Sequence, residues 1–191
     1  LRFSTTDGVQ SNEFSEHAVF EKNDGEIIVG GINGFNTFYP TDISPGKYDP
    51  KTTITDFQLF NETIRVSDNV EERSPLSKSI QLTDSLSLLP GENNLAFEFS
   101  ALIYSNPEKV KYAYMLDGFD EDWNYTDAFN RRANYTNLPY GNYTLIVKST
   151  NNDGQWDESI TDLHIHIKTP FFHTWVAYVL YALFVILVLV Y

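Results

Sequence analysis

The chain has 191 residues, contains no cysteine and carries a net charge of −13. Such an acidic surface argues against direct binding to nucleic acid, whose phosphates it repels, and the lack of cysteine excludes disulfides, thiol nucleophiles and cysteine zinc sites. Apolar residues make up 42% of the chain and aromatic residues 15%, which is enough for a packed core and favours strands over helices.

Residues 1–40 are expected to form a short antiparallel meander. Residues 18–22 and 26–30 have the pattern of strands and flank Asn-Asp-Gly, a strong hairpin turn, while a second turn at Asn33 and Gly34 leads into a third strand. Three strands so close together are typical of one propeller blade. Because a single blade cannot bury both of its faces, we interpret this segment as the last blade of a larger array lying upstream.

Residues 41–51 have the composition of a linker, with Pro45, Gly46 and Pro50. Residues 52–169 contain about as many short apolar runs, separated by turn-forming residues, as one β-sandwich of the immunoglobulin or fibronectin type requires. We expect strands over residues 54–60, 79–89, 94–102, 111–116, 143–149 and 162–168. Residues 61–78 fit this pattern least, and we predict no element for them.

Alternation along these strands predicts which side chains face the core. In residues 54–60 the mostly apolar face carries Thr55, Phe57 and Leu59, opposite Ile54, Asp56 and Gln58. Aromatic residues at alternating strand positions are usually core residues. The predicted aromatic core residues are Phe97, Phe99, Tyr112, Tyr114 and Tyr143.

Residues 170–191 are expected to form a juxtamembrane turn followed by a truncated transmembrane helix. From Trp175 to Tyr191 there is no charged residue, glycine or proline. As a helix this run would rise about 26 Å, a few residues short of the roughly 30 Å of hydrocarbon in a bilayer, so we expect it to continue. Trp175, Tyr178 and Tyr181 are placed as an interfacial aromatic belt would be.

The clusters of polar residues do not indicate a catalytic or metal-binding site. Five carboxylates lie in or near the turn after residue 116: Asp117, Asp120, Glu121, Asp122 and Asp127. Their spacing does not match an EF-hand calcium loop, so a solvated acidic turn is the favoured interpretation. His164 and His166 share one face of a strand without an evident third metal ligand, while His17 and His173 are isolated. No catalytic motif, metal site or cofactor is predicted.

Aromatic residues on loops are the candidate ligand contacts. Trp123, Tyr140 and Trp156 could stack on sugar rings, or they could pack back on the sandwich. The sequence leaves both readings open.

Several stretches of the chain resemble one known family. YAYMLDGFDEDW (residues 112–123), RRANYTNLPYGNYTLIVKSTNNDGQW (131–156) and TPFFHTWVAYVLY (169–181) resemble the Y_Y_Y domain. That domain precedes the membrane in hybrid two-component sensors of the Bacteroides type. GVQSNEFSEHAVFEKNDGEIIVGGINGFNTFYP (8–40) resembles the last propeller blade of the same proteins.

The resemblance implies a signal-relay module of a sensor histidine kinase, without catalytic parts of its own. It implies a periplasmic domain on the bacterial inner membrane, an oligosaccharide bound mainly by upstream propellers, and pairing into a homodimer. The alternative is a membrane-anchored glycan-binding or adhesion domain without kinase output.

Overall fold

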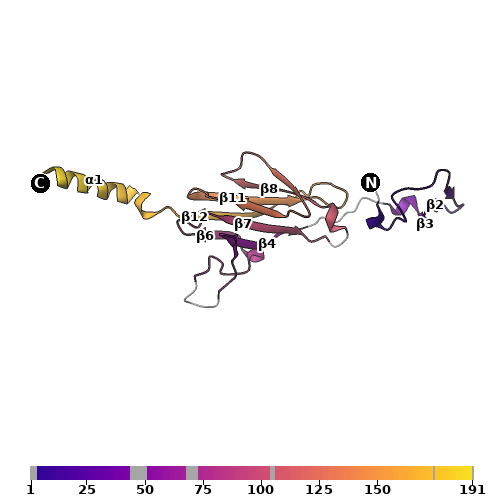
Figure 1. Cartoon of the computed structure of the whole chain (residues 1–191), viewed down its shortest axis with the longest axis horizontal. Helices are drawn as coiled ribbons and strands as arrows, with labels where there is room; N and C mark the ends of the chain where they lie inside the picture. The colour runs from indigo at the N-terminus through magenta and orange to yellow at the C-terminus, as the bar shows by residue number, and fades with distance from the viewer. Residues whose placement is uncertain (1–3, 44–50, 68–72, 104–105, 174, 191) are drawn as a thin grey trace.

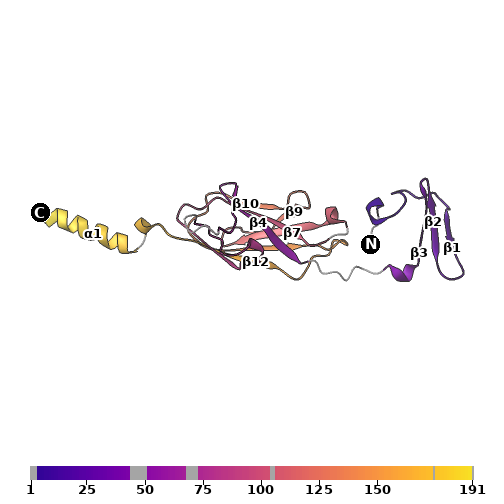
Figure 2. The ribbon, with the colours of Figure 1, turned by 90° about the horizontal axis from the view of Figure 1, so that it is seen from below.

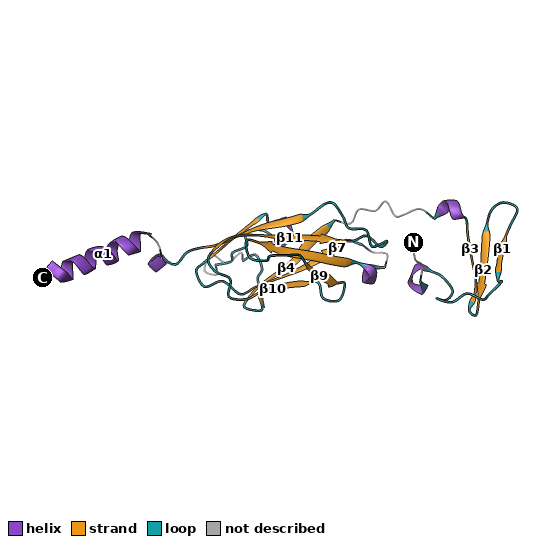
Figure 3. Cartoon of the chain, turned by 90° about the horizontal axis from the view of Figure 1, so that it is seen from above, coloured by secondary structure: helices purple, strands orange, loops and turns teal. Residues whose placement is uncertain are grey.

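The computed structural model describes residues 4–43, 51–67, 73–103, 106–173 and 175–190 as three β-sheets and a C-terminal helix (Figure 1). A small sheet lies at one end of an elongated molecule, two larger sheets form its middle, and helix α1 projects from the other end (Figure 2, Figure 3). The predicted mostly-β architecture with one C-terminal helix is confirmed.

The small sheet consists of β1 (Val19–Glu21), β2 (Ile27–Gly31) and β3 (Gly34–Phe38), all antiparallel. The predicted hairpin turn is present. Gly25 has a φ of +84°, which suits glycine, and its N–H donates to the Lys22 carbonyl at 3.0 Å. No residue of β1, β2 or β3 is buried, because three strands alone offer nothing that covers their faces.

Most of the predicted linker, residues 44–50, lies outside the described residues. Its two ends are described: a 3-10 turn, η2, covers Pro40–Asp42, and the first strand of the middle region begins at Thr52.

The first large sheet has the order β10-β7-β4-β5, formed by β4 (Thr52–Leu59), β5 (Glu62–Thr63), β7 (Leu95–Ala101) and β10 (Arg132–Tyr135). The face predicted for β4 is wrong in its first half. Ile54 is buried and Thr55 is exposed, because a β-bulge shifts the register against β7 between Ile54 and Asp56. After the bulge, Phe57 and Leu59 face the core as predicted.

The second large sheet has the order β6-β12-β11-β8-β9. Its strands are β6 (Ser85–Leu88), β8 (Lys111–Asp117), β9 (Asn124–Asp127), β11 (Gly141–Ser149) and β12 (Thr161–Ile167). The β6–β12 pair is parallel and the other pairs are antiparallel. The strand predicted over residues 79–89 is shorter than expected, since Ile80–Leu82 form the 3-10 turn η3 before β6.

The two large sheets share one hydrophobic core. Phe57 stacks on Phe97 with ring centroids 5.1 Å apart, and both side chains are fully buried. Leu145 and Leu163 of the second sheet are equally buried in the same cluster. Of the predicted aromatic core residues, Tyr114 is only partly buried, while the remaining four are buried.

Helix α1 covers Trp175–Val190 and follows a 3-10 turn, η5, over Phe171–His173. Its 16 residues correspond to a rise of about 24 Å. Within the described residues, no helix has the length and apolar character needed to cross a membrane. The helix begins at Trp175, as predicted, and most of its apolar side chains are exposed.

Candidate functional site

The three candidate aromatic residues lie in two different places. Trp123 and Trp156 come together around Lys148 on the outer face of the second sheet. The Lys148 Nζ atom lies 4.2 Å from the ring centroid of Trp123 and 5.4 Å from that of Trp156, which is cation–π geometry. Tyr125 of β9 sets its ring edgewise against Trp156 at 5.7 Å. These four residues are called the aromatic cluster below.

The aromatic cluster covers a small side chain of the sheet. Ala113 of β8 pairs with Lys148 on one side and Tyr125 on the other, so its side chain points outward with theirs. It is nevertheless 0% exposed. The cluster therefore packs against the sheet as a second, small hydrophobic layer, although Tyr125 and Trp156 keep 69% and 39% of their surface exposed.

Tyr140 lies at the opposite end of β11, near the connection to α1. Its ring stacks on that of His173 in η5, with centroids 5.9 Å apart and an interplanar angle of 28°. The Nδ1 atom of His173 lies 3.5 Å from the hydroxyl of Tyr178 in α1. His173, which is isolated in the sequence, thus contacts both the sandwich and the helix.

The three predicted interface aromatics all lie on α1 and are exposed. Trp175 is 77% exposed, and Tyr178 and Tyr181 meet edgewise at 6.4 Å. In the part of the chain that the structure describes, no other residue buries these three side chains. They are therefore available to an apolar or interfacial environment.

The acidic turn has a structural use. The Oδ2 atom of Asp120 accepts hydrogen bonds from the Leu116 N–H at 2.8 Å, the Tyr135 hydroxyl at 2.7 Å and the Asn124 side chain at 3.2 Å. Because Tyr135 lies on β10, this carboxylate joins the two large sheets. Burial, and then the hydrogen bond to Asp120, raise the pKa of Tyr135.

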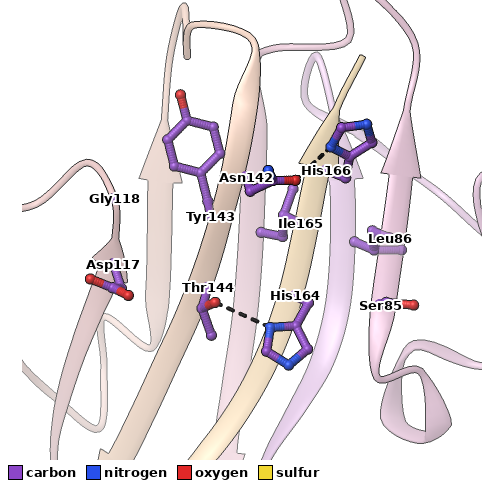
Figure 4. A pocket seen from close by; sticks show the side chains of 10 residues that line it. All are labelled: Ser85, Leu86, Asp117, Gly118, Asn142, Tyr143, Thr144, His164, Ile165 and His166. Atoms are coloured by element: carbon purple, nitrogen blue, oxygen red, sulfur yellow. Dashed lines mark hydrogen bonds between the residues drawn. The ribbon is translucent and has the colours of Figure 1, made fainter.

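His164 and His166 share the outer face of β12, as predicted, and line a shallow hollow there (Figure 4). The Nδ1 atom of His164 lies 3.1 Å from the Thr144 hydroxyl, and that of His166 lies 2.6 Å from the side-chain oxygen of Asn142 (Figure 4). In the part of the chain that the structure describes, no three His, Cys, Asp or Glu side chains are grouped to hold a metal ion.

Residues 103–168 match the model of the Y_Y_Y domain. These residues include the aromatic cluster and the histidine face, and the resemblance to the Y_Y_Y domain found in the sequence is confirmed for this part of the chain.

Similarity to a known protein also covers residues outside the Y_Y_Y match. The chain is 34% identical over 181 residues to Histidine kinase P4 of Formosa agariphila, in a match that covers 95% of the chain. It spans only 13% of that protein's length. The chain is thus similar to a small part of a histidine kinase.

Two solved structures from B. thetaiotaomicron have the same fold, each the extracellular domain of a proposed hybrid two component system. The BT3049 domain matches 87% of the chain at 25% identity with a TM-score of 0.65. The BT4673 domain matches 80% of the chain at 31% identity with a TM-score of 0.56. The chain spans about a fifth of each, 22% and 20% respectively.

Lys148 and His173 organise the two aromatic groups, and the sequence reasoning did not single out either for this role. Alternation along residues 143–149 puts Lys148 on the outward face, but the loops that bring Trp123 and Trp156 to it cannot be placed from sequence. The contact of His173 with Tyr140 likewise joins residues 33 positions apart.

Proposed function

We propose that this chain is the extracytoplasmic signal-relay module of a membrane-bound sensor histidine kinase in a hybrid two-component system. The observation that carries the proposal is the match to Histidine kinase P4, because one alignment of 181 residues covers the small sheet, the sandwich and at least part of α1. The chain itself would be non-catalytic, and the kinase would lie elsewhere in a longer protein.

The sandwich is proposed to be of the immunoglobulin or fibronectin type. In support, β10-β7-β4 and β12-β11-β8-β9 have the strand order of the two facing sheets of that fold. The Tyr143 hydroxyl also donates to the Pro139 carbonyl at 2.8 Å near the start of β11, as a tyrosine corner does. The small sheet, which has no buried residue, is proposed to be the last blade of an upstream propeller that senses an oligosaccharide.

Helix α1 is proposed to be the first part of the membrane-inserted output of the module, with the sandwich in the periplasm. This proposal is supported by the continuous apolar character of Trp175–Val190 and by the exposure of most of these side chains. Exposed apolar side chains are unfavourable in water. The His173 contacts to Tyr140 and Tyr178 provide a path from the sandwich to this helix.

The relay is proposed to work in a homodimer. Two arrangements of the paired modules would differ in the angle or rotation of α1, and upstream ligand binding would favour one arrangement over the other. The signal would then be the difference in stability between the two arrangements.

A cysteine scan of α1 tests the proposal in the longer protein. Because the chain has no cysteine, single cysteines at residues 182–189 would be the thiols that report on this helix. In native membranes, oxidation should give disulfide-linked dimers with a repeat of three to four residues, and the linked forms should change their autophosphorylation severalfold. Equal or absent cross-linking at all positions would contradict pairing through this helix.

A further inference from the structure

We infer that Asp7 latches the small N-terminal sheet to the sandwich. Its carboxylate forms an ion pair with Lys109, and it accepts a hydrogen bond from the side chain of Asn106 at 2.6 Å. These two partners follow Asp7 by 102 and 99 positions. Among the ion pairs of the described residues, this is the one that joins the two parts of the chain.

The carboxylate of Asp7 is held from its own side as well. It accepts hydrogen bonds from the N–H of Ser4 at 2.8 Å and from the hydroxyl of Ser4 at 3.0 Å, a capping box around the 3-10 turn η1 (Thr5–Asp7). Only 14% of the Asp7 side chain and 29% of the Lys109 side chain are exposed. The hydrogen bond from Lys109 is the main reason that the pKa of Asp7 is lowered, so the carboxylate is charged at neutral pH.

The partners on the sandwich are positioned by the 3-10 turn that precedes β8. Asn106 has a φ of +50°, a left-handed conformation that asparagine tolerates well. Pro107 starts the 3-10 turn η4 (Pro107–Lys109), in which the Lys109 N–H donates to the Asn106 carbonyl at 3.1 Å. This turn places both donors toward the same carboxylate.

A second set of contacts ties the Asp7 segment to the small sheet. Asn36 of β3 donates from its side chain to the Gly8 carbonyl at 3.0 Å and accepts from the Gln10 N–H at 2.7 Å. The Gln10 side chain in turn accepts from the Asn33 N–H at 2.9 Å. Polar contacts at Asp7 and at Gly8, the next residue of the chain, therefore connect η4 to β3.

This latch would make the small sheet and the sandwich move as one body. Turning the sheet against the sandwich would separate a charge-assisted pair and leave a carboxylate without two of its donors. The inference deepens the proposed relay and rests on it for its signalling purpose, because a movement upstream reaches α1 only if this connection is stiff.

Electron spin resonance distance measurements test the latch without reference to kinase activity. Spin labels would be attached to Glu21→Cys in β1 and Asp122→Cys in the sandwich of the 191-residue chain in detergent solution, where these would be its only two thiols. We expect one narrow distance distribution with Asp7 present, and at least a twofold broader one in Asp7→Asn. Lys109→Met should broaden it as well, and this variant serves if Asp7→Asn folds poorly.

Asp24→Asn is the matched control, because Asp24 is a carboxylate in the turn between β1 and β2 whose partners, Glu26 and Tyr39, are local. It should leave the distribution narrow. A broad distribution in the unsubstituted chain, or an equally narrow one in both latch variants, would overturn the latch. Neither result would change the outcome of the cysteine scan of α1. The two experiments therefore distinguish a failure of the latch from a failure of the proposed relay.

Discussion

The hydroxyl of Tyr143 donates a hydrogen bond to the carbonyl oxygen of Pro139, four residues earlier, at 2.8 Å. The side chain of Tyr143 is buried, and burial raises its pKa. This contact fixes the turn that leads into β11, the strand that carries Lys148 at its far end. The same turn holds Tyr140 against His173, so the bond also positions the connection to α1.

Tyr143→Phe should therefore lower the free energy of unfolding by about 1 kcal/mol, the usual contribution of one such hydrogen bond. Urea unfolding followed by circular dichroism would measure the loss. Tyr140→Phe is the control, because Tyr140 is half exposed and only its ring makes a described contact. Equal stability of the two variants would show that the tyrosine bond contributes nothing.

The contact of Tyr135 with Asp120 predicts a dependence of stability on alkaline pH. The pKa of Tyr135 in the folded protein is raised above its ordinary value of 10.0 by burial and by that hydrogen bond. A group whose pKa is raised on folding keeps its full stabilisation below the unfolded pKa and loses it as pH rises toward the folded pKa. Stability should therefore fall above about pH 10.

Tyr135→Phe should flatten this fall without removing it, because burial also raises the pKa values of Tyr114 and Tyr143. The measurement is the free energy of unfolding between pH 9 and pH 11 for both proteins. A slope that is unchanged by the substitution would mean that Tyr135 ionises equally in the folded and unfolded states.

The shared core predicts a large cost for removing one ring. Phe97→Ala deletes a fully buried side chain that stacks on Phe57, so unfolding should become easier by about 3 to 5 kcal/mol. Phe129→Ala removes the same group from a site that is 77% exposed, and should change stability by less than about 0.5 kcal/mol. Thermal or urea unfolding distinguishes the two, and similar losses would contradict the placement of the core.

The aromatic cluster predicts a role for Lys148 in packing. Lys148→Met keeps the aliphatic stem but removes the charge near both tryptophans, which should cost about 0.5 to 1 kcal/mol. The tryptophan emission spectrum should shift in the same variant. Lys168→Met, an exposed lysine for which no ring contact is described, serves as the control. An unchanged spectrum in Lys148→Met would contradict the cluster.

Local patterns predicted much of the fold. The turn sequence before Glu26 predicted the first hairpin, and period-two alternation placed Phe97 and Phe99 in the core because that strand has no irregularity. Alternation failed at Ile54, where a bulge adds one residue and reverses the faces. Nothing in the local sequence indicates which strands carry bulges.

The candidate site was harder to predict, because its contacts join residues distant in sequence. The loop aromatics were identified as notable, but Tyr140 proved to be separate from Trp123 and Trp156. The pairing of Asp7 with Lys109 spans 102 positions. Contacts of this kind depend on the packing of whole sheets, which the composition of each segment does not specify.

The relay through α1 is tested most directly by changing the phase of the helix. In the longer protein, one to four alanines inserted after Val176 rotate the rest of α1 by about 100° for each residue. We predict that basal autophosphorylation in membranes rises and falls with the number of inserted residues, whereas the same insertions after Asp153, in an exposed turn, leave it unchanged. Autophosphorylation that is the same for all insertions in α1 would contradict the relay.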